Sequence, residues 1–186
     1  KLSKNNFDAD RVNIVIGAHL MSNPATVRQL ADAGIQYVVY NSEIVNPSGI
    51  NTAGKRDHLD RVFLPLLRGA RAVWDCNQSN VGALARYGIQ ASWLEPGYHP
   101  VLEEIRHKKN KDIDFLWYGS MTENRRQLLV KLQSAGFKVA AVFDPTAMYR
   151  NDLIARAKVI LVPRQGAGMD QLPYWRIVYQ LHNRCS

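Results

Sequence analysis

The sequence contains little cysteine, no metal-ligand pattern and no long hydrophobic run. Its 186 residues include two cysteines, which are too few for a disulfide framework, and five histidines without the spacing of metal ligands. No apolar run approaches the roughly 18 residues that a membrane-spanning helix needs, and the first residues lack the pattern of a signal peptide. We therefore expect no metal, no other cofactor, and a location in the reducing environment of the cytoplasm.

Familiar catalytic motifs are also missing. The chain has no Walker loop with a GK[ST] ending, no GxGxxG dinucleotide motif, and no legible Ser-His-Asp or Cys-His nucleophile arrangement. Candidate functional residues must therefore be sought from their positions relative to the predicted strands.

The charge is unevenly distributed over a composition that is otherwise typical of a globular protein, with 46% apolar and 22% charged residues. Residues 1–107 contain 11 Lys or Arg and 10 Asp or Glu, a balance of +1, whereas residues 108–186 contain 13 and 6, a balance of +7. This basic excess suggests an anionic partner, such as a nucleotide diphosphate, a nucleic acid or a membrane surface. A solvated basic surface without a partner is the alternative.

Short apolar runs rich in β-branched residues alternate with amphipathic stretches, so we predict alternating strands and helices. Asn23 and Pro24 are typical of a helix start. Strands that read as continuous apolar runs indicate parallel sheets covered on both faces. The predicted strands are residues 12–17, 36–40, 72–75, 91–94, 113–118, 138–143 and 159–162, and the predicted helices are 25–33, 57–67, 79–87, 123–135, 148–157 and 174–182.

A break in this alternation divides the chain. Residues 95–100 include two prolines and a glycine, and residues 107–111 form a charged run. We therefore predict an α/β protein with two Rossmann-like halves, residues 1–107 and residues 108–186. The second half has three predicted strands, fewer than a doubly wound domain normally has, so we expect it to be incomplete.

Two loops of the basic half are candidates for binding phosphate, because ligands of parallel sheets lie beyond the carboxyl ends of the strands. The first has a turn, Gly119 and Ser120, followed by Arg125 in the next helix; a plain tight turn is the alternative. The second spans residues 163–170, for which a flexible connection is the alternative. It contains Arg164, Gly166 and Gly168, and Arg176 in the next helix is either a further phosphate ligand or the partner of an acidic side chain.

Polar residues in the first half point to an acceptor site. His19 and Glu43 come directly after two consecutive strands, where they could act as a general base or bind an acceptor, although a lone histidine is more often structural. Asp75 and Asn77 end the third strand and could hydrogen-bond a polyol. Capping of the helix that begins at Ser79 or Asn80 is the favoured alternative for this pair.

Several segments resemble bacterial GT-B glycosyltransferases, most closely the spore-maturation-type glycosyltransferase-like proteins. DIDFLWYGSMTENRRQLLVKLQSAGFKV is similar to the opening of their nucleotide-sugar-binding half, and NDLIARAKVILVPRQGAGMDQLPYWRIVYQLHNR to its next signature. Upstream, YVVYNSEI, AVWDCNQSNVGALARYG and LEPGYHP are similar to the acceptor-side half. The resemblance implies two Rossmann domains, a donor nucleotide sugar in the cleft between them and no obligatory metal. It also implies donor phosphates beside Gly119 and Ser120, Arg176 as the motif arginine, and His19 facing the cleft.

The resemblance therefore implies a metal-independent glycosyltransferase of polysaccharide biosynthesis. It would move a sugar from a nucleotide-diphosphate donor to a glycan or another hydroxyl-bearing acceptor, with contact to a membrane surface through the basic half as a further expectation. The alternative is a non-catalytic GT-B-like module that binds a nucleotide or a partner, because Pro173 stands where the family has a glutamate. A nucleic-acid-binding protein ranks last, since no RNA-recognition or zinc-finger signature is present.

Overall fold

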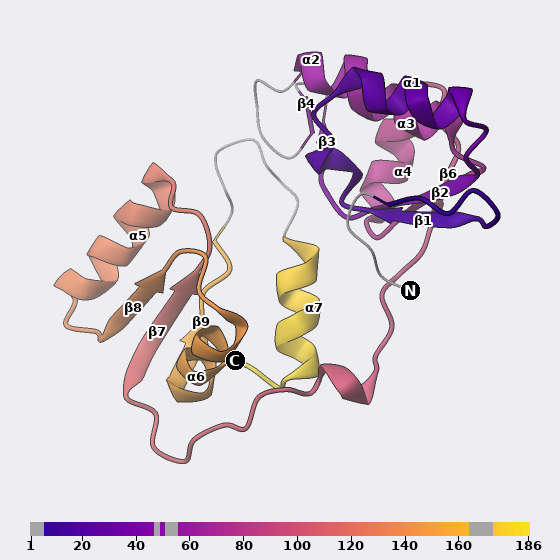
Figure 1. Cartoon of the computed structure of the whole chain (residues 1–186). Helices are drawn as coiled ribbons and strands as arrows, with labels where there is room; N and C mark the ends of the chain where they lie inside the picture. The colour runs from indigo at the N-terminus through magenta and orange to yellow at the C-terminus, as the bar shows by residue number, and fades with distance from the viewer. Residues whose placement is uncertain (1–5, 47–48, 51–55, 164–172) are drawn as a thin grey trace. The chain divides into compact units, whose positions relative to one another are not determined.

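The computed structural model describes residues 6–46, 49–50, 56–163 and 173–186, and it is an α/β protein. Its contacts divide the chain into two compact units, Lys1–Pro96 and Gly97–Ser186 (Figure 1). This division falls inside the proline- and glycine-containing segment that the sequence marked as a break. It places residues 97–107 with the second unit, whereas the predicted boundary lay after residue 107.

The first unit has a parallel four-stranded sheet in the order β1-β2-β5-β6. A short antiparallel hairpin and several helices follow the carboxyl ends of these strands, so the prediction of alternating strands and helices is confirmed for this unit. The strands are β1 (Asn13–Ile16), β2 (Tyr37–Asn41), β5 (Ala72–Asp75) and β6 (Ala91–Trp93), with the hairpin strands β3 (Val45–Asn46) and β4 (Gly49–Ile50). The helices are η1 (Ala18–Leu20), α1 (Pro24–Asp32), α2 (Arg56–His58), η2 (Leu59–Phe63), α3 (Leu64–Gly69) and α4 (Gln78–Ala85).

Local sequence explains where these helices begin. Asn23 caps α1 by accepting a hydrogen bond from the N–H of Ala25, and Pro24 occupies the first position, as predicted. The helix predicted over residues 57–67 is instead interrupted by η2, a π-helical turn closed by a bond from the Leu64 N–H to the Leu59 carbonyl. Pro65 has no N–H to donate to the fourth residue before it, and this favours the irregular turn.

The helices of the first unit cover one face of its sheet (Figure 1). Val15, Val39 and Val73 on that face are buried in the core. Ile14 and Ile16 point to the other face and are 59% and 63% exposed. The prediction of sheets covered on both faces is therefore wrong for this edge of the first sheet, because all the crossover helices pack on the same side.

The second unit has a parallel three-stranded sheet in the order β8-β7-β9. Leu116 and Ile160 share the face on which helix α6 packs, whereas Trp117 lies on the opposite face and contacts Arg125 of α5. Here both faces are covered, as predicted. The strands are β7 (Ile113–Tyr118), β8 (Val139–Val142) and β9 (Ala157–Ile160), and the helices are η3 (Pro100–Leu102), α5 (Glu123–Ser134), α6 (Ala147–Arg156) and α7 (Tyr174–His182).

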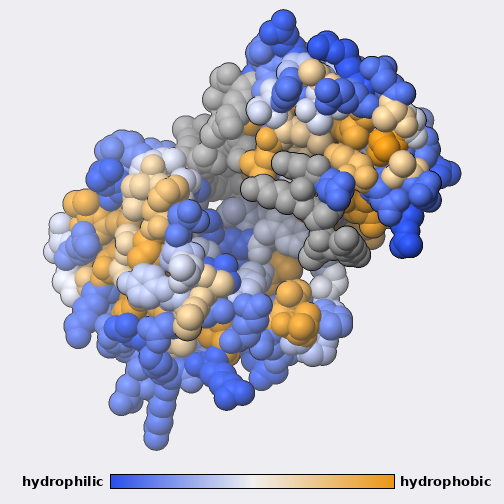
Figure 2. Space-filling view, viewed as in Figure 1, coloured by the Kyte–Doolittle hydropathy of each residue, from blue (hydrophilic) through white to orange (hydrophobic). Residues whose placement is uncertain are grey.

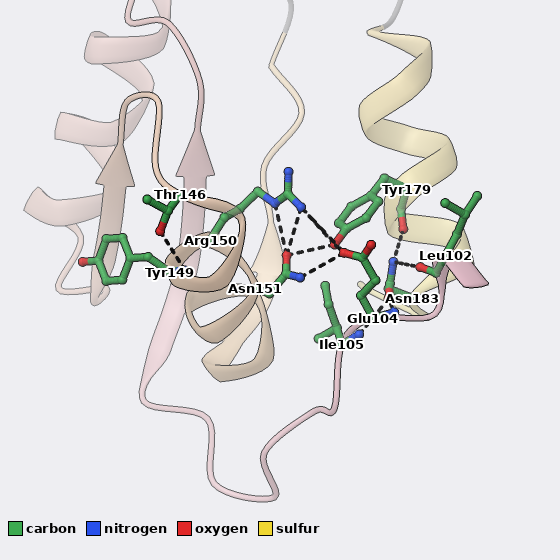
Figure 3. Close-up of polar contacts among 9 residues, drawn as sticks. All are labelled: Leu102, Glu104, Ile105, Thr146, Tyr149, Arg150, Asn151, Tyr179 and Asn183. Atoms are coloured by element: carbon green, nitrogen blue, oxygen red, sulfur yellow. Dashed lines mark hydrogen bonds and ion pairs between the residues drawn. The ribbon is translucent and has the colours of Figure 1, made fainter. Parts of the chain in front are cut away.

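Asn183 attaches residues 97–107 to the end of α7. Its Oδ1 accepts hydrogen bonds from the N–H groups of Glu104 (2.8 Å) and Ile105 (2.9 Å), and its Nδ2 donates to the carbonyls of Leu102 (3.0 Å) and Tyr179 (2.9 Å) (Figure 3). Because Asn183 is 4% exposed, these bonds lie away from water and replace hydration that the backbone has lost.

A second polar group extends this attachment to α6. Arg150 lies over the ring of Tyr179, with 4.6 Å from Cζ to the ring centroid, and donates to the Tyr179 hydroxyl oxygen at 3.1 Å (Figure 3). Asn151 donates to the carboxylate of Glu104 at 3.1 Å. These bonds join α6, α7 and the segment before β7 into one closed polar cluster.

Figure 2 shows how polar and apolar residues are distributed over one face of the molecule. On the face drawn in Figure 2, hydrophilic residues predominate and apolar residues form separate patches. Within the described ranges, no helix is both long enough and apolar enough to cross a membrane.

Candidate functional site

The carboxyl end of β7 brings together four of the residues predicted to bind phosphate: Gly119, Ser120, Arg125 and Arg176. Gly119 follows the strand with a φ of 127°, a value that favours glycine. A Cβ built there would meet Nη2 of Arg176 at 2.6 Å. The guanidinium of Arg176 therefore occupies the space that any other side chain would need, directly against the turn.

Arg125 holds the turn in place. This arginine of α5 is 5% exposed, and its Nη1 donates to the carbonyl oxygen of Ser120 at 2.9 Å and to the Ser120 hydroxyl at 3.2 Å. Its Nη2 reaches the Pro163 carbonyl, beyond the end of β9, at 3.4 Å. Arg125 thus connects two neighbouring strand ends and fixes the conformation between β7 and α5.

Arg176 extends from α7 to the same place, and two of its three guanidinium nitrogens make no hydrogen bond. Its Cζ lies 4.5 Å from the ring centroid of Trp117 and 5.1 Å from that of Tyr118. Its Nε and Nη1 are buried and make no hydrogen bond. Among the residues that the structure describes, no acidic side chain forms an ion pair with either arginine, and Asp170 lies outside them, so the alternative of an acidic partner for Arg176 stays open.

Burial weakens the hydration of both arginines. It lowers the pKa of Arg125, and the positive charge of Arg176 lowers that pKa further. Burial likewise lowers the pKa of Arg176. Because arginine still remains protonated at neutral pH, this arrangement confines two positive charges in a poorly hydrated place.

Three further buried polar atoms at the end of β7 and the start of α5 also make no hydrogen bond: Nε1 of Trp117, Oγ1 of Thr122 and Nε of Arg125. Buried polar groups are normally hydrogen-bonded, so a cluster of unused donors calls for a ligand or water that accepts from them. Donors combined with positive charge at the start of α5 suit an anion rich in oxygen acceptors, such as a phosphate.

Three of the predicted phosphate-binding residues cannot be placed beside this site. Arg164, Gly166 and Gly168 lie outside the described residues. Their assignment to phosphate binding therefore stays a prediction.

In the first unit, the structure brings His19 and Glu43 together at the carboxyl ends of β1 and β2. Gly17, with a φ of 78°, leads into the short helix η1 that carries His19. Nε2 of His19 lies 3.4 Å from Oε1 of Glu43, and the two side chains are 17% and 26% exposed. Since Nδ1 of His19 is buried, the Glu43 carboxylate is the more accessible group of this pair.

Asp75 lies at the same edge of the sheet, but it is fully buried. Its Oδ2 accepts from Nδ2 of Asn41 at 2.7 Å, and its Oδ1 accepts from the N–H of Asn77 at 2.8 Å and from Nδ2 of Asn80 at 3.0 Å. Burial raises the pKa of Asp75 to about 6, although these hydrogen bonds act in the opposite direction. Direct contact between Asp75 and an acceptor would require this network to open.

Asn77 caps helix α4, which is the role that the sequence favoured over binding of a polyol. Its Oδ1 accepts from the N–H of Ser79 at 3.1 Å, at the start of α4. Asn41 and Asn80, the partners of Asp75, were not among the predicted site residues. The one signal for Asn41 is a polar residue at the end of an apolar strand, and Asn80 looks like any polar residue in the first turn of a helix.

Among the described residues, no three His, Cys, Asp or Glu side chains are grouped so that they could hold a metal ion. No protein-family model matches the chain, and a search of curated proteins found no match. The sites are therefore interpreted from their own geometry.

Proposed function

We propose that this chain is a nucleotide-sugar-dependent glycosyltransferase in which, as in GT-B enzymes, one unit binds the donor and the other binds the acceptor. The second unit would bind the diphosphate of the donor. The observation that carries the proposal is Arg176: a desolvated guanidinium, without a described acidic partner, packed against Gly119 at the end of a parallel strand. Its unused donors match the oxygens of a phosphate, and the start of α5 adds partial positive charge.

The same charges suit the chemistry of sugar transfer. When the bond between the anomeric carbon and the diphosphate oxygen breaks, the bonding electron pair leaves with the nucleotide as negative charge. Donors that are already oriented stabilise such charge most effectively in a poorly hydrated site. Arg176 would supply this stabilisation, while Arg125 keeps the Ser120 turn in position, so that in this proposal no metal is required.

The acceptor side is assigned to the first unit. A hydroxyl group of the acceptor would give its proton to the Glu43 carboxylate as its oxygen forms the new bond to the anomeric carbon. His19, 3.4 Å from Glu43, would orient that carboxylate. A glycan or another hydroxyl-bearing molecule fits this chemistry.

A non-catalytic nucleotide-binding module is the second candidate. It is favoured by Pro173, which precedes α7 and contributes no side-chain cap, at the position where glycosyltransferases of the family have a glutamate. Both candidates require nucleotide binding, but only the enzyme cleaves the sugar from its nucleotide.

The test is a calorimetric titration of the chain with UDP, GDP, CDP, ADP and dTDP at two salt concentrations, repeated with Arg176→Ala and Arg126→Ala. Arg126 lies on α5 beside Arg125 but is 66% exposed, so its variant makes the same change in charge without touching the site. Loss of a charged hydrogen bond is expected to weaken nucleotide binding by about 1.5–3 kcal/mol, more than tenfold, in Arg176→Ala alone.

Equal weakening in both variants would point to non-specific attraction of the anion, and absence of binding to any nucleotide would refute the donor site. If a nucleotide binds, incubation with its sugar conjugates separates the two candidates, because slow hydrolysis to the free sugar is expected of the enzyme only.

A further inference from the structure

We propose that Asp75, together with Asn41 and Asn80, forms a buried positioning network for the Glu43 carboxylate. This inference rests on the acceptor side of the proposed function, in which Glu43 takes the proton of the acceptor. It assigns a role to a group of buried polar residues that have no ligand of their own.

The main chain of Glu43 is held at both of its polar groups. Its N–H donates to Oδ1 of Asn41 at 3.2 Å. Its carbonyl oxygen accepts from Nδ2 of Asn41 and from Nδ2 of Asn80, each at 2.8 Å. Asn80 also accepts, through Oδ1, from the N–H of Val45 at 3.0 Å, so the segment is held two residues further on as well.

Asp75 determines which way the two amides point. An ionised carboxylate only accepts hydrogen bonds, so the NH₂ groups of Asn41 and Asn80 must face it. Their oxygens are then turned toward the N–H groups of Glu43 and Val45. With the amides reversed, two oxygens would face the carboxylate and the backbone N–H groups would lose their acceptors.

The network is rigid because it is buried away from water and because its members lie on two paired strands and a helix. Asn41 and Asp75 are register partners at the ends of the parallel strands β2 and β5, and Asn80 is in the first turn of α4. All three are at most 1% exposed. Buried polar networks whose members are all satisfied specify one arrangement.

Glu43 itself is different: its side chain is 26% exposed and reaches His19. The backbone from which this side chain begins is thus fixed from inside the protein, while the side chain itself is partly exposed. Precise placement of a base relative to its substrate contributes strongly to catalysis.

The test uses the ring signals of His19 in nuclear magnetic resonance titrations of the full chain, which require no substrate. Glu43→Gln is the reference, because it removes the negative charge beside His19 and should lower the midpoint of the His19 titration. Asn80→Ala changes no charge, so we expect it to move this midpoint in the same direction by at least half as far. Asp75→Asn is expected to do the same, although it also removes a charge of its own.

Tyr37→Phe is the matched control. It removes another buried hydrogen bond of β2, the one from the Tyr37 hydroxyl to the Leu66 carbonyl at 2.9 Å, without touching the network. We expect it to leave the His19 midpoint unchanged. The proposal would be overturned if the His19 midpoint moved in Glu43→Gln but stayed unchanged in Asn80→Ala. It would also be overturned if the midpoint moved as far in Tyr37→Phe as in Asn80→Ala.

A measurement on the unmodified chain covers the case in which the variants fail to fold. The side-chain NH₂ signals of Asn41 and Asn80 and the N–H signal of Glu43 should follow one common titration, that of Asp75; separate midpoints would overturn the proposal. Nucleotide binding by Asn80→Ala should equal that of the unmodified chain, because the donor site lies in the second unit. A chain that binds no nucleotide but shows the expected His19 shifts would refute the donor site and leave the network standing.

Discussion

Stability of the first unit should decrease as Asp75 ionises. The carboxyl is fully buried, and burial raises its pKa from 3.8 to about 6. In the folded state it therefore holds its proton more tightly than in the unfolded chain. A raised folded-state pKa gives stability that is fully present below pH 4 and is lost as the pH rises through 6.

The size of this effect follows from the difference between the two pKa values. About two pH units correspond to roughly 3 kcal/mol of unfolding free energy, since one unit is about 1.4 kcal/mol. The Asp75→Asn variant cannot ionise at this position, so it should lack this component, although it is expected to be less stable overall because an amide NH₂ would face the NH₂ groups of its neighbours.

The assay is denaturant unfolding of the chain and of Asp75→Asn at several pH values between 4 and 7.5, monitored by fluorescence. Trp74 and Trp93 report on the first unit, and replacing Trp117 and Trp175 by phenylalanine in both proteins restricts the signal to it. The stability of the parent relative to the variant should fall by about 3 kcal/mol across this range. All other carboxyl groups are the same in both proteins, so their contributions to the difference in unfolding free energy cancel. A difference that does not change with pH would therefore refute the reasoning.

Three further predictions concern the second unit. Gly119→Ala should destabilise it by about 1–3 kcal/mol in chemical unfolding, because the residue would be strained at its positive φ and would collide with Arg176; unchanged stability would show that the turn adapts. Asn183→Ala should cost about 2–4 kcal/mol in the same assay, since buried backbone groups lose their partners; a cost within error would mean that water replaces the amide. Arg156→Ala should raise the pKa of Asp112 from about 2 toward its ordinary value in an NMR titration, because the guanidinium that bonds this carboxylate is gone; an unmoved titration would assign the low pKa to other charges.

Sequence reasoning identified the elements of the fold better than their packing. Apolar runs such as VNIVIG and IDFLWY are strands because their β-branched and aromatic side chains suit buried parallel sheets. The π-helical turn η2 was missed, since periodicity places apolar residues in a helix without revealing which hydrogen bond a proline removes. Exposure of Ile14 and Ile16 was missed too, because a continuous apolar run does not show on which side the crossover helices pack.

For the candidate sites, a rule of topology guided the choice of residues. Ligands of parallel sheets lie beyond the carboxyl ends of the strands, and this rule singled out His19 and Glu43 in the first unit and the Gly119 turn in the second, whose roles stay predictions. The asparagine network could not be predicted, because Asn41 and Asp75 are 34 residues apart and their bond depends on register. The stacking of Arg176 on Trp117 depends on how α7 returns to the sheet, which no local pattern encodes.

The attachment of Asn183 to residues 102–105 has a consequence for the order of folding. The N–H of Ile160 in β9 also donates to the carbonyl of Ser186 at 2.7 Å, so residues 183–186 contact both β9 and a segment some eighty residues earlier. During synthesis the first unit can form while the second is still being made, whereas the second cannot close until α7 and the residues after it have left the ribosome. Closure of the second unit therefore depends on residues 183–186, and breaking their contacts should affect its folding more than the loss of an equally long surface loop.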